Sequence, residues 1–245
     1  MRDRGQSEVL GFVFIFGIVI LAIGLVVTTG YVGLQNAQDF ERTNNAERAF
    51  DVLADNVDDV TQRGAPSRAT ELRLSDARLS TGEPVTITVS GERVSNSEEE
   101  FTYTETIHPI VYDSGTGTEI TYTNGALLRQ DDGSGVMIRD PNFVLGDDVV
   151  IVPVVRTYPA DDESIGVSGQ STVLVRTSHS DSDLHHETDG EYHVTIEVIS
   201  PRADTWEQSL SEEADCDLID EDSVQCTVTT NRVYVSVDRV GVTID

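Results

Sequence analysis

A long uncharged and mostly apolar segment near the N-terminus restricts the fold of this chain more than any other feature. No charged residue occurs between Glu8 and Asp39. As a helix, residues 9–34 would be roughly 39 Å long at about 1.5 Å per residue, enough to cross a hydrocarbon core about 30 Å thick. A secretory signal peptide has a shorter apolar region and ends at a small-residue cleavage site, for which Thr28-Thr29-Gly30 is a weak match. We therefore predict a transmembrane segment over residues 9–34.

Charge is distributed unevenly on the two sides of this segment. Arg2 and Arg4 precede it, whereas Asp39, Glu41 and a long acidic region follow it. Basic flanks tend to stay in the cytoplasm. We therefore expect a single-pass protein of the cell membrane, in contact with membrane lipid, with a cytoplasmic N-terminus and an extracellular C-terminal domain.

The junction Arg4-Gly5-Gln6-Ser7-Glu8, directly before the apolar run, resembles the class III signal peptide of archaeal type IV pilins and archaellins. The resemblance implies that residues 1–5 are a leader, which a prepilin peptidase removes by cutting between Gly5 and Gln6. It also implies that the retained helix packs into a filament core, with Glu8 as the assembly candidate. Pilins of this type commonly carry a glutamate at the fifth mature position, whereas Glu8 would be third. Beyond the junction, the chain resembles uncharacterised pilin-like membrane proteins of halophilic archaea that have a β-rich outer domain.

Glycines inside the apolar segment leave two interpretations open. Gly17 and Gly24, seven positions apart, lie on one face of a helix. Small residues let membrane helices approach closely, which favours packing against copies of the same chain or against other proteins. Glycine is also generally more frequent in membrane helices than in soluble ones. The pattern is therefore compatible with a homo- or hetero-oligomer without requiring one.

Beyond the apolar run, hydrophobic residues recur at spacings of mostly three and four, the pattern of an amphipathic helix. They are Phe40, Ala46, Ala49, Phe50, Leu53, Val57 and Val60. The sequence Arg63-Gly64-Ala65-Pro66 ends this pattern. We predict one helix from about Ser7 to about Thr61, within a helical region 6–63, with a stripe on which a globular domain docks. A stalk or a coiled-coil dimer would show a similar stripe.

From Thr70 onward the periodicity changes to two, which indicates strands. The predicted strands cover residues 71–75, 85–90, 101–108, 119–123, 149–156, 173–178, 192–200, 224–230 and 232–237. The strand at 149–156 is apolar on both faces and should be central, although Pro153 removes a ladder donor and favours an edge or a bulge. The sequence thus predicts an α+β protein in which the long helix precedes an all-β sandwich-like head domain over residues 70–245.

One short helix should interrupt the strands of the head. Ser200-Pro201 is suited to the cap and first turn of a helix. Ala203, Trp206 and Leu210 then share one side, up to Ser211-Glu212-Glu213. This helix should pack against the sheets through that side.

The composition indicates the setting of the protein. The chain has 44 acidic and 16 basic residues, for a formal charge of −28, and all the basic residues are arginines. An acidic surface without lysine resembles that of proteins from salt-accumulating halophiles, where concentrated salt screens self-repulsion. The charge makes nucleic acid an unsuitable partner. It reflects either a solvated halophilic surface or a surface that binds a basic partner.

The two cysteines, Cys216 and Cys226, are ten positions apart. Outside a cell such a pair is most simply a disulfide, which would stabilise the fold by roughly 3 kcal/mol in the loop-entropy model. Two free buried thiols are the alternative.

Candidate catalytic and metal-binding patterns are weak. His179, His185 and His186 lie among acidic residues, but their spacing matches no zinc motif. Asp181-Ser182-Asp183-Leu184 starts like a calcium loop, yet His186 occupies the position that needs glycine. We interpret this segment as an acidic surface loop. Two glycine-rich segments, 113–117 and 131–135, are turn signals without phosphate-binding features.

No nucleophile can be paired with a base in the sequence, so we expect neither catalytic residues nor a metal or cofactor, and no enzyme. The favoured function is that of a type IV pilin-like surface subunit for adhesion or surface contact, anchored by its helix and assembled into a filament. The alternative is an uncleaved, membrane-anchored surface protein whose β-sandwich head is a binding module.

Overall fold

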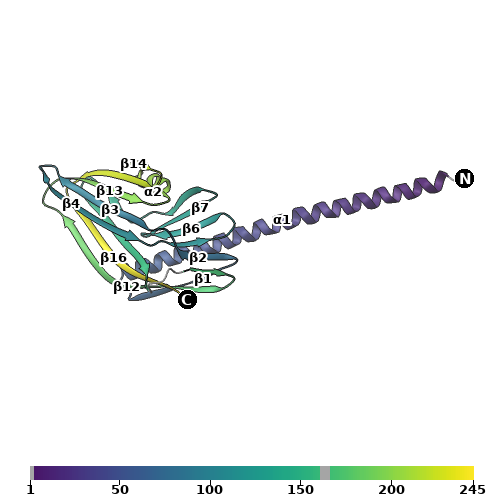
Figure 1. Cartoon of the computed structure of the whole chain (residues 1–245), viewed down its shortest axis with the longest axis horizontal. Coiled ribbons are helices and arrows are strands. Elements are labelled where there is room, and N and C mark those ends of the chain that lie inside the picture. Colours follow the sequence, from purple (N-terminus) through teal and green to yellow (C-terminus); the bar gives the residue numbers. More distant parts are fainter. Residues whose placement is uncertain (1–2, 161–165) are drawn as a thin grey trace. The chain divides into compact units, whose positions relative to one another are not determined.

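The computed structural model describes residues 3–160 and 166–245, with side chains from Val9 onward. It contains a long helix, α1 (Asp3–Thr61), a short helix, α2 (Ala203–Leu210), and three β-sheets (Figure 1). The predicted α+β fold is therefore confirmed. The chain separates into two compact units, Met1–Asn44 and Asn45–Asp245. The second unit includes the last part of α1 because that part contributes to the core of the head.

The helix α1 begins four residues before the predicted start at Ser7 and ends where predicted. No proline interrupts the first residues, and an acidic residue such as Asp3 is favourable in a first helical turn. At the other end, the Ala65 amide donates to the Asp59 carbonyl at 3.0 Å. Gly64 adopts a φ of 72°, the left-handed conformation that glycine tolerates at helix ends. Pro66 follows, so the helix cannot continue.

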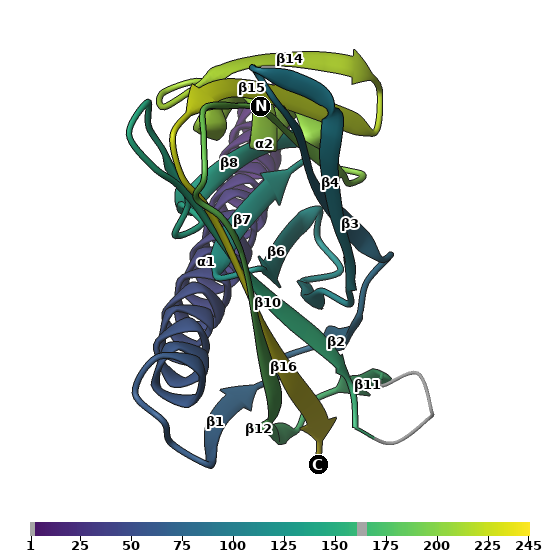
Figure 2. The same ribbon diagram turned by 90° about the vertical axis from the view of Figure 1, so that its left-hand side faces the viewer.

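The first sheet, sheet A, has the strand order β1-β12-β16-β10-β9. Its strands are β1 (Ser67–Arg73), β12 (Thr172–Glu187), β16 (Val233–Ile244), β10 (Val150–Pro159) and β9 (Val144–Leu145). The strands β10 and β16 run side by side in parallel, whereas the other pairs are antiparallel (Figure 2). The β9 strand pairs with β10 at Val150 and Ile151 alone. Pro153 therefore lies along a stretch of β10 that β9 does not cover, as its missing donor requires.

Sheet B has the strand order β11-β2-β5-β6-β7-β8. Its strands are β11 (Gly166–Gly169), β2 (Ala77–Thr81), β5 (Ile110–Asp113), β6 (Thr118–Thr123), β7 (Ala126–Asp131) and β8 (Ser134–Arg139). Two tight turns fix its register. Asn124 and Gly125 connect β6 to β7, and Asp132 and Gly133 connect β7 to β8, all with positive φ. Asn-Gly and Asp-Gly are the preferred pairs for such two-residue hairpins.

Sheet C has the strand order β14-β15-β13-β3-β4. Its strands are β14 (Asp215–Asp220), β15 (Ser223–Thr230), β13 (Tyr192–Ile199), β3 (Val85–Arg93) and β4 (Asn96–Ile107). Each of the predicted strands is present. The sequence did not predict β2, β5, β7, β8, β9, β11 and β14, which are short or lie beside turns.

The head has two hydrophobic cores. The first core lies where β10 and β16 of sheet A face sheet C, with Trp206 and Leu210 of α2 and Leu128 of β7 at its margin. This part is the predicted sandwich. The second core forms where the stripe of α1 packs on sheet B and on the remaining part of sheet A. An amphipathic helix on a sheet is an α/β layer, and it forms here because the predicted stripe of α1 docks on the strands of the head.

The stripe of α1 is buried as predicted within the head unit. Phe50 and Val57 are fully buried and Leu53 is 1 % exposed. Charged pairs flank the stripe. Arg139 of β8 contacts Asp51, Asp55 and Asp58, at 3.6, 2.9 and 2.5 Å. Arg129 of β7 contacts Glu47 at 3.3 Å. The last turns of α1 are thus fixed to the sheets by apolar packing and by ion pairs.

The short helix was predicted with the correct buried side, since Ala203, Trp206 and Leu210 are all buried. Its cap differs from the prediction. The helix begins at Ala203, with Arg202 rather than Ser200 in the cap position and no side-chain capping bond. The Ser200 hydroxyl instead accepts a hydrogen bond from the Arg202 amide at 3.2 Å.

Candidate functional site

The N-terminal part of α1 is the first candidate functional region. It is long and apolar enough to cross a membrane, and none of its most apolar stretch is buried within the chain. The two threonine hydroxyls of this stretch find partners within the helix itself. The Thr29 hydroxyl donates to the Leu25 carbonyl at 2.7 Å, and the Thr28 hydroxyl donates to the Gly24 carbonyl. Because a buried hydroxyl without a partner is costly in hydrocarbon, these bonds make the segment compatible with a membrane anchor.

The glycines of this segment are not required by packing within the chain. A Cβ added at Gly11, Gly17 or Gly24 would meet no atom within 4 Å. Any close approach that these glycines permit therefore concerns lipid or another chain.

The junction residues Gly5, Gln6 and Glu8 lie inside α1. Their side chains are outside the part of the chain that the structure describes. The proposed cleavage after Gly5 and the assembly role of Glu8 therefore stay predictions.

The histidine-rich segment predicted as an acidic surface loop is a strand, and that prediction was wrong. Residues Asp181–Glu187 belong to β12 and pair with β16. Their acidic side chains are compatible with pairing because Arg239 of β16 contacts Asp181 at 3.1 Å and Asp183 at 2.7 Å. The Asp183 hydrogen bond raises the pKa of Arg239 despite partial desolvation. The segment therefore completes an edge of the sandwich.

His185 and Glu187 contact β4 at one margin of the sandwich. The His185 ring stacks on Tyr103 of β4 at 4.4 Å. The Tyr103 hydroxyl donates to the Glu187 carboxylate at 3.1 Å. Burial, followed by this bond to a carboxylate, raises the pKa of Tyr103. Across residues 3–160 and 166–245, no group of three or more His, Cys, Asp or Glu side chains is arranged to hold a metal ion.

The disulfide between Cys216 and Cys226 links β14 to β15. The two residues are directly paired in the register of the strands. Both are buried against the first core, whereas Leu218 and Ile219 further along β14 are about half exposed, at 47 % and 57 %. The crosslink therefore holds a strand that has few buried residues of its own.

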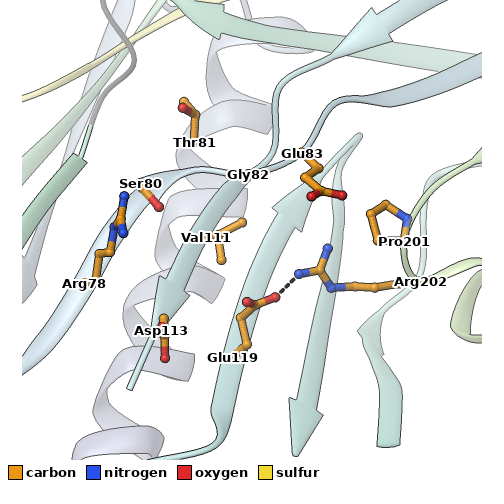
Figure 3. A pocket seen from close by; sticks show the side chains of 10 residues that line it. All are labelled: Arg78, Ser80, Thr81, Gly82, Glu83, Val111, Asp113, Glu119, Pro201 and Arg202. Carbon is orange, nitrogen blue, oxygen red and sulfur yellow. Dashed lines mark ion pairs between the residues drawn. The ribbon is translucent and has the colours of Figure 1, made fainter. Parts of the chain in front are cut away.

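A groove of about 780 Å³ lies on sheet B beside the loop that precedes α2. Arg78, Asp113 and Glu119 line it from the strands, and Arg202 reaches it from the loop (Figure 3). Arg202 forms an ion pair with Glu119. Burial lowers the pKa of Arg202, while the charge of Glu83 acts in the opposite direction.

The groove offers both donors and acceptors, so it can hydrogen-bond a polar ligand. The Arg202 guanidinium, however, already pairs with Glu119 through Nη2, and the pair connects the α2 loop to β6. This arrangement could not be predicted from the sequence, because Glu119 and Arg202 are far apart in the chain and no local motif marks either of them.

These features define a class of protein: a β-rich head that follows one long apolar helix compatible with a membrane anchor. Within that class, the chain belongs to a family of unknown function, DUF7289, whose model matches residues 4–243. No curated protein and no solved structure matches the chain. The matched region includes the junction, the apolar helix and nearly all of the head.

Proposed function

We propose that this protein is a type IV pilin-like subunit of a cell surface, anchored by α1 and assembled through it into a filament for adhesion or surface contact. The observation that carries the proposal is the junction Arg4-Gly5-Gln6-Ser7-Glu8 directly before an apolar helix. That helix continues without a break to Thr61, where its stripe joins the head. A pilin spine requires this two-part helix. The family of unknown function to which the chain belongs spans residues 4–243, so its model covers the junction together with the helix and the head.

The proposed orientation follows from charge. Arg2 and Arg4 stay in the cytoplasm, and the head, with its excess of acidic residues, lies outside the cell. The disulfide agrees with an extracellular head, since disulfides persist in oxidising compartments. Arginine without lysine and the large negative charge suit a halophilic archaeal setting. In this proposal the head acts by binding rather than by catalysis, and nucleic acid is not its partner.

One observation favours an uncleaved anchor as the second candidate. Glu8 is one helical half-turn closer to Gln6 than the usual pilin glutamate, so its pairing with the new N-terminus of a neighbouring subunit is altered. In this alternative the chain keeps residues 1–5, stays in the membrane and uses the head as a binding module.

N-terminal mass spectrometry of the membrane-extracted protein distinguishes the two candidates. A mature chain that begins at Gln6 supports the pilin-like subunit, whereas an intact Met1 rejects processing. Gly5→Val should block the cleavage, because the peptidase recognises the residue before the cut. Gly11→Val is the matched control, since a Cβ at Gly11 meets nothing within 4 Å, and this variant should still be processed. Equal processing of both variants contradicts the proposal.

A further inference from the structure

The groove on sheet B, which we call the sheet B groove, has a floor formed by three neighbouring strands. Arg78 and Ser80 are two positions apart on β2, so their side chains point to the same face of the sheet. Val111 of β5 pairs with Ser80 in the register, and Glu119 of β6 completes the floor. Leu79 points to the opposite face, where it is fully buried in the second core. The groove therefore opens on the face of sheet B that α1 does not cover.

The guanidinium of Arg78 is a charged group of this groove without a partner in the head. Across residues 3–160 and 166–245 it forms no hydrogen bond and no ion pair. Asp113 is its direct neighbour in the register, but the Gly115 amide donates to the Asp113 carboxylate at 2.8 Å. Arg129 and Arg139, the other arginines of sheet B, each contact carboxylates of α1. Arg78 is thus the arginine of this sheet that remains available to a ligand.

Glu83 is the corresponding carboxylate on the other side of the groove. It follows the end of β2 and, within the part of the chain that the structure describes, forms no hydrogen bond and no ion pair. Its charge acts on Arg202, but the Arg202 guanidinium pairs with Glu119 instead (Figure 3). Arg78 and Glu83 lie on opposite sides of Val111 in the same view. The groove therefore offers a cation on one side and an anion on the other, too far apart to pair with each other.

We propose that the sheet B groove binds a short zwitterionic peptide, whose terminal carboxylate contacts Arg78 and whose terminal ammonium contacts Glu83. A purely anionic ligand would lie against Glu83 and Glu119, and a purely cationic one against Arg78 and Arg202, so like charges would meet in either case. Hydrogen bonds to charged groups are stronger than neutral ones, so a zwitterion gains more than an uncharged polyol does. These contacts are direct and do not depend on long-range attraction, which concentrated salt removes.

The size and the lining of the groove suit a ligand of this kind. Its volume of about 780 Å³ lies within the range of about 300–1,000 Å³ that is typical of small-molecule sites. The hydroxyls of Ser80 and Thr81 also line it and can hydrogen-bond a peptide unit. The inference rests on the part of the proposed function in which the head acts by binding, and it names the chemical class of the ligand.

Calorimetric titration of the full chain, extracted from membranes and kept in concentrated potassium chloride, tests the proposal on the unaltered protein. The ligands are dialanine, N-acetyl-dialanine, which lacks the ammonium, and dialanine amide, which lacks the carboxylate. Each of the last two should bind at least about tenfold more weakly than dialanine, because each loses a hydrogen bond between charged groups. Equal binding of the three peptides, binding of none, or binding of uncharged maltose but not of dialanine overturns the proposal.

Two substitutions assign the two charges. Arg78→Gln should bind dialanine and its amide equally, because the carboxylate has lost its partner. Glu83→Gln should bind dialanine and the acetylated peptide equally. Arg73→Gln and Glu92→Gln are the matched controls, since both are exposed residues of the same types on β1 and β3, outside the groove. The controls should bind as the unaltered chain does, and equal losses in a variant and its control contradict the assignment of that charge.

N-terminal mass spectrometry of the same preparation separates this inference from the proposed function. A chain that begins at Gln6 but does not discriminate among the three peptides refutes the groove alone. An intact Met1 together with selective binding of dialanine refutes the processing alone.

Discussion

The two parts of α1 share a backbone conformation but differ in where their apolar side chains are placed. In the N-terminal part apolar residues surround the helix, and Phe14 is 68 % exposed within the chain. In the part that belongs to the head, apolar residues form one stripe, and Phe50 is fully buried. A helix that is apolar on all sides needs an external apolar phase, while a striped helix can be covered by its own domain. The distribution of apolar residues, rather than their number, thus determines which part the chain can bury.

The charged residues follow the same division. The head part of α1 carries Glu47, Asp51, Asp55 and Asp58, which contact arginines of sheet B. The N-terminal part has no charged residue from Val9 to Gln38. Substitutions and pH should therefore act on the two parts in different ways, which the following experiments measure.

Replacement of Phe50 should have the largest effect. Phe50→Ala removes a fully buried ring that packs in the second core and contacts Tyr112 edge-on at 6.4 Å. Large-to-small aromatic substitutions in cores cost about 3–5 kcal/mol. We expect a loss of this size in the free energy of unfolding, measured by urea titration with fluorescence of Trp206, the single tryptophan. Phe14→Ala is the control and should leave the unfolding of the head unchanged. If both variants lost a similar free energy of unfolding, the division of α1 into a part buried in the head and an N-terminal part outside it would be contradicted.

The converse substitution tests the N-terminal part. Leu21→Arg places a charge in the middle of the apolar segment, where Leu21 is 72 % exposed within the chain. Insertion of arginine at the centre of a membrane helix costs about 2.5–3.5 kcal/mol. We expect less protein to resist alkaline extraction from membranes. Val52→Arg is matched to it, because Val52 is an exposed apolar residue of the same helix, at 51 %. If the two variants are retained equally, the N-terminal part is not the anchor.

The sequence predicts those features of the fold that depend on near neighbours. The spacing of Phe50, Leu53 and Val57 shows the docked stripe, and Gly64 with Pro66 marks the end of the helix. Regular alternation identifies long strands such as β13. In each case the pattern is complete within about ten residues, and a single local rule accounts for it.

Features that depend on distant pairing could not be predicted. The acidic segment of β12 has the composition of a loop, and it becomes a strand because Arg239 of β16 neutralises Asp181 and Asp183. The ion pair of Arg202 with Glu119 joins a loop to a strand of another sheet. One signal was available but unused: Asn124-Gly125 is a strong hairpin sequence and could have located β7 next to the predicted strand at 119–123.

The smallest expected effect concerns Asp58 and Asp59 at the end of α1. Their contributions to the stability of the fold should change with pH in opposite directions. Burial raises the pKa of Asp58, although the charge of Arg139 acts against it. Asp59 accepts hydrogen bonds from Arg63 and Arg68, and these bonds lower its pKa. The folded state thus binds a proton at Asp58 more tightly, and at Asp59 less tightly, than the unfolded state does.

Linkage converts these shifts into stability. The contribution of Asp58 is present below the ordinary carboxyl pKa of about 3.9 and is lost as the pH rises through the raised value. The contribution of Asp59 is present above about 3.9 and is lost as the pH falls through the lowered value. Asp58→Asn should therefore make the free energy of unfolding rise more steeply from acid to neutral pH, and Asp59→Asn should make it rise less steeply. Urea titrations at a series of pH values measure both slopes. If both slopes change in the same direction, the charge of Arg139 outweighs burial in setting the pKa of Asp58. The docked part of α1 would then be held by charge as well as by its apolar stripe.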